Sequence, residues 1–143
     1  MILTRRYRFS ASHRLHSPSL SDERNREIYG KCNNPYGHGH NYVLEVSVEG
    51  TPDSRSGRLM AIADLDDVVR EKVLAVYDGK YMNRDVAVFS GSLVPTTENV
   101  VIDIRTRLET EWPRPGEAYR YTARMPRLAG VRLFETKKNI FDI

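Results

Sequence analysis

Four histidines are the residues best suited to metal chemistry in this sequence, and all of them lie within the first 40 positions. Two form the local pattern His38-Gly39-His40, and on an extended strand residues i and i+2 face the same side, so both imidazoles can reach one point. His13 ends a second alternating segment and can supply a third imidazole. Three nitrogen ligands with one open position are typical of a catalytic zinc site. The alternative is that these are unrelated surface or core histidines. That explanation suits any single histidine, but it is less suited to three histidines that can reach one point.

A single thiol, Cys32, precedes the histidine pair on a turn rich in Gly, Asn and Pro. We expect this turn to hold the thiol near the metal, where a divalent cation lowers a thiol pKa and makes the sulfur a base or nucleophile. A lone cysteine is more often a small buried hydrophobe, so the hypothesis depends on its neighbours. With no second cysteine in the sequence, no disulfide is expected within the chain.

Two carboxylates occupy positions at which a charge needs an explanation. Glu135 shares the alternation phase of Val131 and Leu133, which points it to the apolar side of its strand. An unpaired carboxylate is costly there, and a ligand with adjacent N–H donors would satisfy it. Glu98 follows two threonines at a predicted helix start, where an acid can simply favour the helix dipole.

The elements that must position these groups follow from hydrophobic periodicity. Alternation predicts strands at residues 2–13, 40–49, 130–136 and 139–143, with a further strand at 119–124. Helical spacing predicts two helices, at residues 64–77 and 97–111. Asp64 is the expected cap of the first helix, and the polar residues 17–31 are expected to form a long loop. This order predicts an α+β fold, an antiparallel sheet with its helices on one face.

Composition and charge narrow the class of protein. With 143 residues, 40% of them hydrophobic, the chain suits one domain over residues 1–143. The net charge of +3 lies in short basic groups without the aromatic interleaving of single-strand binders, so we expect no nucleic-acid partner. No apolar run approaches membrane-spanning length, and residues 1–15 lack the apolar core of a signal peptide. We therefore expect no membrane association and a cytoplasmic protein.

Four motifs lie in one order along nearly the whole chain. They are Phe9-Ser10-Ala11-Ser12-His13, Cys32-Asn33-Asn34-Pro35-Tyr36-Gly37-His38-Gly39-His40-Asn41-Tyr42, Thr96-Thr97-Glu98-Asn99-Val100 and Phe134-Glu135-Thr136. Together they resemble the 6-pyruvoyltetrahydropterin synthase family. The five-residue spacer between Cys32 and His38 is similar to that of the synthases. The related 6-carboxytetrahydropterin synthases more often have a shorter one.

The resemblance implies a T-fold, in which a four-stranded antiparallel sheet carries two helices on one face. It also implies an assembly in which three sheets join into a barrel and two trimers form a homohexamer. In this family the three histidines that match His13, His38 and His40 bind zinc.

The resemblance further implies the remaining site residues and the reaction. Cys32 matches the catalytic base, and Asp78 matches the aspartate that acts with it. Glu135 matches the glutamate that anchors the small-molecule pterin, with Glu98 and Thr97 as secondary substrate-binding candidates. The family reaction converts 7,8-dihydroneopterin triphosphate to 6-pyruvoyltetrahydropterin with elimination of triphosphate.

Two departures from the family pattern keep other functions open. Gly79 follows Asp78 where the family usually carries a histidine that relays protons, and no histidine occurs after His40. Residues 112–129 are also longer than the family needs before its third strand. The alternatives are 6-carboxytetrahydropterin formation or retro-aldol cleavage of dihydroneopterin on the same scaffold, and a weakly catalytic pterin-binding protein.

Overall fold

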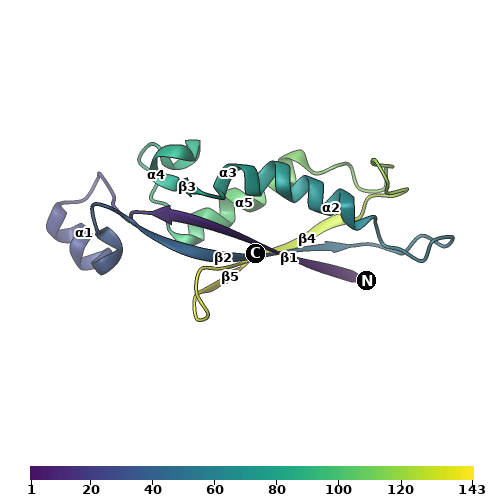
Figure 1. The fold of residues 1–143 in the computed structure, drawn as a ribbon, viewed down its shortest axis with the longest axis horizontal. Helices are drawn as coiled ribbons and strands as arrows, with labels where there is room; N and C mark the ends of the chain where they lie inside the picture. The colour runs from purple at the N-terminus through teal and green to yellow at the C-terminus, as the bar shows by residue number, and fades with distance from the viewer.

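A five-stranded sheet carries the three candidate histidines in a computed structural model that describes residues 1–143 (Figure 1). Its strands are β1 (Ile2–His13), β2 (His38–Glu49), β3 (Lys80–Tyr81), β4 (Arg127–Phe134) and β5 (Ile140–Asp142). They lie in the order β3-β1-β2-β4-β5. All neighbours pair antiparallel except β3, which runs parallel to β1. The short strand β3 was not predicted, and it adds a parallel strand to the four-stranded antiparallel sheet that the resemblance implies.

Helices cover one face of this sheet, which confirms the predicted α+β class (Figure 1). The covering helices are α2 (Ile62–Val69), α3 (Ala75–Tyr77), α4 (Met82–Asp85) and α5 (Thr97–Glu111), whereas α1 (Asp22–Tyr29) lies beyond the end of the sheet. A π-helical turn over Arg70–Leu74 joins α2 to α3, so these three segments form one continuous helical rod, which corresponds to the helix predicted at 64–77. The apolar stripes of this rod and of α5 pack on the sheet in one cluster of 22 buried residues. Each fully buried aliphatic side chain contributes about 1.5–3 kcal/mol.

The two long helices begin in different ways. The predicted cap of α2 was wrong, because the N-cap is Ala61, which has no capping side chain. Asp64 instead lies fully buried in the first turn, where its carboxylate accepts the Tyr121 N–H at 3.1 Å. At α5, Thr96 is the cap and its hydroxyl accepts the Asn99 N–H.

The segment at residues 17–31 was predicted to be a loop, and this prediction was wrong. It contains α1, which is followed by a 3-10 turn over Gly30–Asn33. The Ser21 hydroxyl caps α1 by accepting the Arg24 N–H at 3.2 Å. The helix is polar on most of its surface, so hydrophobic periodicity could not reveal it. In Figure 1, α1 projects beyond the end of the sheet at which β1 ends.

The predicted strand at residues 119–124 was also wrong. Tyr119 and Thr122 form one isolated bridge in which each backbone N–H donates to the other carbonyl. Arg120, between them, has a positive φ of 28°, so the chain turns tightly instead of extending. The segment packs beside the start of α2 and joins no sheet.

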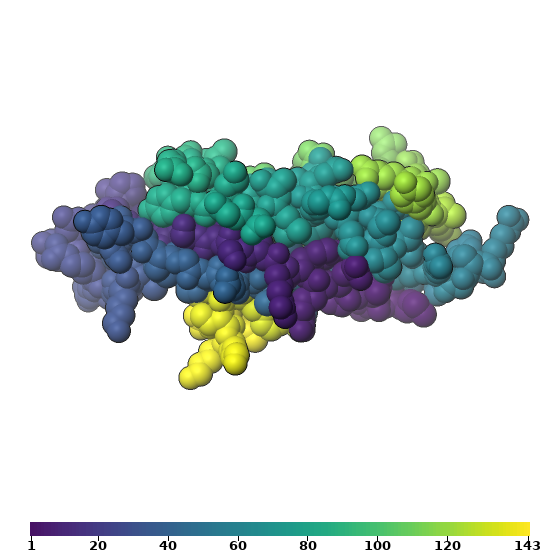
Figure 2. Space-filling view, viewed as in Figure 1, coloured from purple at the N-terminus to yellow at the C-terminus, as the bar shows by residue number.

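Strands β4 and β5 form a hairpin at the C-terminal end of the chain. β4 and β5 pair through Arg132–Asp142 to Phe134–Ile140, and their connection projects on the side away from the helices, in yellow in Figure 2. No element of the chain covers the second sheet face (Figure 1). None of the helices has the length and apolar character that crossing a membrane would require.

Candidate metal centre

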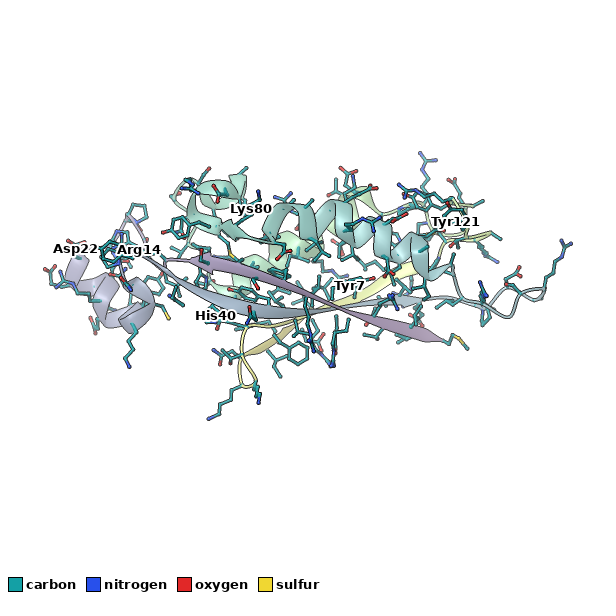
Figure 3. The ribbon with its side chains drawn as sticks, viewed as in Figure 1. Tyr7, Arg14, Asp22, His40, Lys80 and Tyr121 are labelled. Atoms are coloured by element: carbon teal, nitrogen blue, oxygen red, sulfur yellow. The ribbon has the colours of Figure 1, made fainter.

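The ends of β1 and β2 bring three histidines together. Strand register pairs His13 with His38 and Ala11 with His40, and directly opposed residues of an antiparallel pair share a face. That face is the one covered by the helices, and His13 is completely buried. The predicted grouping of these three side chains is therefore present in the folded chain. Figure 3 shows His40 near the end of the sheet that carries α1.

The three imidazoles lie edge to face around one point. Ring centroids are separated by 4.7 Å for His13–His38, 4.9 Å for His38–His40 and 5.2 Å for His13–His40. One nitrogen from each ring lies within 4.8 Å of the others. The Nε2 atoms of His13 and His38 are 3.1 Å apart. With zinc–nitrogen bonds of about 2.1 Å, two ligand atoms of a tetrahedral centre lie about 3.4 Å apart.

Hydrogen bonding and burial leave the ring nitrogens available to a cation. The His13 Nδ1–H can donate only to the Pro95 carbonyl, 2.8 Å away, which directs the Nε2 lone pair into the cluster. His38 Nδ1 and His40 Nε2 are buried without any hydrogen-bond partner. Burial lowers the pKa of His13 to about 4 and also lowers that of His38, so both rings are neutral near pH 7. This donor set fits zinc.

One glycine of the connecting turn is required by close packing. Gly37 has a φ of 72°, and a Cβ atom there would lie 2.9 Å from the His13 carbonyl oxygen. A side chain is therefore excluded on both conformational and steric grounds. This close approach of the turn to β1 sets the position at which β2 begins with His38.

Glu135 lies against the histidine cluster, just past the end of β4. Its Oε1 is 3.8 Å from His13 Nε2 and 3.7 Å from His40 Nε2. The Thr97 hydroxyl donates to Oε1 at 2.7 Å, and the Asn139 amide donates to Oε2 at 3.1 Å. Burial opposes ionisation, but these two hydrogen bonds, together with the neighbouring His40 and His13, hold the pKa of Glu135 below its usual value. The structure thus provides an oriented, ionised carboxylate at the cluster.

Cys32 lies on the 3-10 turn that follows α1 and is half-buried. Its carbonyl accepts the Leu15 N–H at 2.9 Å, which ties the turn to the residues that follow β1. Burial first, and the charge of Glu135 second, raise the pKa of the Cys32 thiol. The protein groups around Cys32 therefore keep it protonated.

Two of the predicted site residues lie outside this cluster within the chain. Asp78 makes one side-chain hydrogen bond, accepting the Ser10 N–H at 2.9 Å on the edge of β1. Gly79 follows it with a φ of 72° and no atom within 4 Å of an added Cβ. Glu98 is exposed in the first turn of α5 and makes no hydrogen bond with its side chain. Neither Asp78 nor Glu98 is hydrogen-bonded to Cys32 or to the histidines.

Sequence reasoning missed three groups that the structure adds to the site. The Pro95 carbonyl orients His13, and the Asn139 amide orients Glu135. No sequence signal marks either of them, because each contact depends on a loop conformation. The third is Tyr42, whose buried hydroxyl has no hydrogen-bond partner. Its position two residues after His40, on the same face of β2, was a usable signal.

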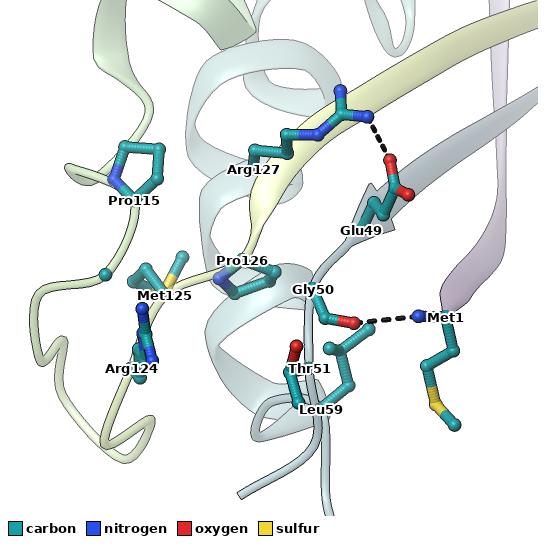
Figure 4. Close-up of a pocket in the computed structure, with 11 residues that line it drawn as sticks. Met1, Glu49, Gly50, Thr51, Leu59, Pro115, Arg124, Met125, Pro126 and Arg127 are labelled. Carbon is teal, nitrogen blue, oxygen red and sulfur yellow. Dashed lines mark hydrogen bonds and ion pairs between the residues drawn. The ribbon is translucent and has the colours of Figure 1, made fainter.

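A groove with a cavity of about 470 Å³ lies at the opposite end of the molecule (Figure 4). Its lining includes Met1, Gly50, Leu59 and Pro126, together with an ion pair between Arg127 and Glu49. It contains no histidine or cysteine. Size alone does not make a site, and the ligand-forming side chains lie at the other end of the sheet.

Fold and site together define an α+β protein of the T-fold type with a three-histidine cluster at one end of its sheet. The family of proteins described as 6-pyruvoyl tetrahydropterin synthase matches residues 2–143 of the chain. The chain belongs to this family.

Individual relatives agree with this placement. The chain is 44% identical to 6-pyruvoyl tetrahydrobiopterin synthase of Poecilia reticulata over 138 residues, which cover 96% of this chain and 86% of the relative. It is 42% identical to the Homo sapiens protein of the same name, covering 96% and 87%. The solved structure of Caenorhabditis elegans 6-pyruvoyl tetrahydropterin synthase matches with a TM-score of 0.86 and 38% identity. That match covers 100% of this chain and 94% of the other.

Proposed function

We propose that this chain is a zinc-dependent lyase of the 6-pyruvoyltetrahydropterin synthase type that acts on 7,8-dihydroneopterin triphosphate. The observation that carries the proposal is the oriented carboxylate of Glu135 beside three clustered imidazoles, two of which have a buried nitrogen without a hydrogen-bond partner. A pterin presents adjacent N–H donors, which an ionised carboxylate accepts in pairs. Family membership and 40–44% identity to named synthases support the same conclusion.

The residues of this chain have distinct roles in the proposal. His13, His38 and His40 would hold zinc, which polarises a substrate oxygen and acidifies the adjacent C–H. Glu135 would fix the heterocycle so that its side chain extends toward the histidines. Cys32 would remove a proton from that side chain, and a cation close to the thiol would favour its thiolate.

The direct test is a product assay. Purified zinc-loaded protein is incubated with 7,8-dihydroneopterin triphosphate, and the products are identified by mass spectrometry. We expect triphosphate and 6-pyruvoyltetrahydropterin in equal amounts. A 6-carboxytetrahydropterin product, or an aldehyde released by retro-aldol cleavage, would replace the proposed reaction by another one on the same scaffold.

Gly79 favours a second candidate function. The imidazole that the family usually carries after the aspartate is replaced here by a hydrogen atom, and nothing occupies the space beside it. Loss of a proton-transfer partner lowers turnover without removing the metal or Glu135. The second candidate is therefore a pterin-binding protein with little turnover, which the same assay separates from the first by binding without product.

We also propose that the chain assembles as a homohexamer, a dimer of trimers. The uncovered sheet face and the two short edge strands β3 and β5 support this, because free sheet edges pair with other strands. Sedimentation equilibrium checks it. The expected particle has six times the 16.5 kDa mass of the chain, and a monomer would contradict the proposal.

A further inference from the structure

One buried hydroxyl beside the metal centre has no partner. Tyr42 lies on β2, two residues beyond His40, and has no exposed surface. Its hydroxyl oxygen makes no hydrogen bond, although buried phenols almost always do. Three buried side-chain atoms of the chain share this condition, and the other two belong to His38 and His40. The unpartnered polar atoms are therefore concentrated at one site.

The packing around Tyr42 shows why its hydroxyl belongs to that site. The Phe9 ring stacks on it at 5.0 Å between centroids, and the His40 ring meets it edge-on at 5.6 Å. Glu135 is one step beyond the Val43–Phe134 pair of β2 and β4, so it is the cross-strand neighbour of Tyr42 on the same face. A phenol hydroxyl can donate one hydrogen bond and can also accept one.

A second buried tyrosine shows the ordinary arrangement. Tyr77 also has no exposed surface, but its hydroxyl donates to Asp103 Oδ2 at 2.5 Å. A buried tyrosine hydroxyl thus has a hydrogen-bond partner under the helices and has none at the histidine cluster. A polar group left without a partner in a folded protein needs an explanation, and a ligand that supplies an acceptor is one.

We propose that the Tyr42 hydroxyl is a substrate-contacting residue, which donates a hydrogen bond to an acceptor atom of the heterocycle that Glu135 anchors. The inference rests on the proposed function for the identity of that heterocycle. A pterin has ring nitrogens and a carbonyl oxygen as acceptors near the N–H groups that a carboxylate binds. Glu135 accepts hydrogen bonds from the N–H groups of the ligand, and Tyr42 donates one to an acceptor atom of the same ligand. Both the Tyr42 hydroxyl and His40 Nε2 are buried and have no hydrogen-bond partner. A ligand that extends to the proposed metal position would give each of these two atoms a partner.

The test replaces only the hydroxyl. Tyr42→Phe is compared with the unmodified protein for binding of 7,8-dihydroneopterin by calorimetry, for zinc content and for Tm without ligand. We expect about tenfold weaker pterin binding, unchanged zinc content and an unchanged or higher Tm, because an unsatisfied buried group has been removed. Tyr77→Phe is the matched control, and it should lower Tm without changing pterin affinity.

Each other outcome overturns the proposal in a recognisable way. Equal pterin affinity of Tyr42→Phe and the unmodified protein removes Tyr42 from the site and leaves the proposed function intact. Weaker binding together with a lower Tm and lost zinc assigns Tyr42 a structural role. Failure of the unmodified zinc-loaded protein to bind the pterin overturns the proposed function and this inference with it.

Discussion

The two ends of the sheet are both rich in buried polar groups, but only one end leaves them without partners. At the far end, Asp64 accepts the Tyr121 N–H, and Thr122 accepts the Ala61 N–H at 3.0 Å. At the histidine end, ring nitrogens of two histidines and one phenol have no partner. Satisfied polar groups stabilise a fold, whereas unsatisfied ones need a ligand. The difference marks the histidine end as the candidate site, which cavity volume does not do, because the cavity at the far end and the one lined by His40 have similar volumes of about 470 and 440 Å³.

Charge at the two ends supports the same distinction. At the far end Arg120 pairs with Asp67 at 2.6 Å and with Glu71 at 3.2 Å, which docks the loop on α2. Exposed pairs of this kind contribute about 0–1 kcal/mol each. At the histidine end, the carboxylate of Glu135 accepts hydrogen bonds from two neutral donors and pairs with no Lys or Arg side chain.

The largest expected effect follows from removing the proposed metal ligands. The double substitution of His38→Ala and His40→Ala leaves one imidazole of three, so zinc content should fall from one ion per chain to almost none. Metal analysis of the purified protein measures this.

His16→Ala is the control for the double variant, because His16 lies outside the cluster and its Nδ1 contacts the buried Asn33 amide. It should retain zinc. If the double variant still carries stoichiometric zinc, the ligand assignment is wrong and the comparison of the two ends loses its basis.

The second expected effect concerns the missing imidazole. Gly79→His should raise synthase turnover by about 10²-fold or more, because a general acid–base partner typically contributes 10²–10⁴-fold. An added Cβ at position 79 meets no atom within 4 Å, and Asp78 Oδ2 makes no hydrogen bond that would compete for an imidazole N–H. The positive φ of 72° should cost about 1–2 kcal/mol of the free energy of unfolding.

Gly79→Ala is the matched control, since it carries the same backbone strain without an imidazole. Steady-state rates of both variants and their unfolding curves separate the two contributions. Equal turnover of the His and Ala variants would show that position 79 does not serve the reaction in this chain.

The third effect concerns the carboxylate. Glu135→Gln replaces an acceptor by a donor, so pterin binding should weaken by about 2 kcal/mol or more, roughly thirtyfold. Calorimetry with 7,8-dihydroneopterin measures this change. Glu117→Gln, at an exposed position in the loop at the far end, is the control and should bind as the unmodified protein does. Unchanged affinity of Glu135→Gln would exclude this carboxylate from the pterin site.

Sequence periodicity was most informative where a buried face repeats regularly. Alternation located β1 and β2, and helical spacing located α5, because each of these elements packs one continuous face on the core. It failed for α1, which has almost no apolar face, and for residues 119–124, where the φ of Arg120 turns the chain. Local polar contacts decide those segments, and they leave no period in the sequence.

For the site, residue type and spacing were enough to group the histidines but not to orient them. The i and i+2 spacing placed His38 and His40 on one face, and strand register brought His13 to them. The Pro95 carbonyl and the Asn139 amide come from loops, whose contacts depend on the whole fold. The resemblance to the synthases suggested the role of Glu135, but its hydrogen bond from Thr97 became visible only in the structure.

The smallest expected effect tests the far end, where polar groups should stabilise the fold and nothing else. Thr122→Val keeps the shape of the side chain and removes the oxygen that accepts the Ala61 N–H at the start of α2. The loss should lower the free energy of unfolding by about 1 kcal/mol, and Tm by roughly 3 °C. Thr122→Ser retains the oxygen and should lose less. Zinc content and pterin affinity should be unchanged in both variants, because α2 and the loop that docks on it contribute no atom to the histidine cluster. A change in either would mean that the far end is coupled to the metal centre, and satisfied hydrogen bonds would then no longer separate structural groups from functional ones in this fold.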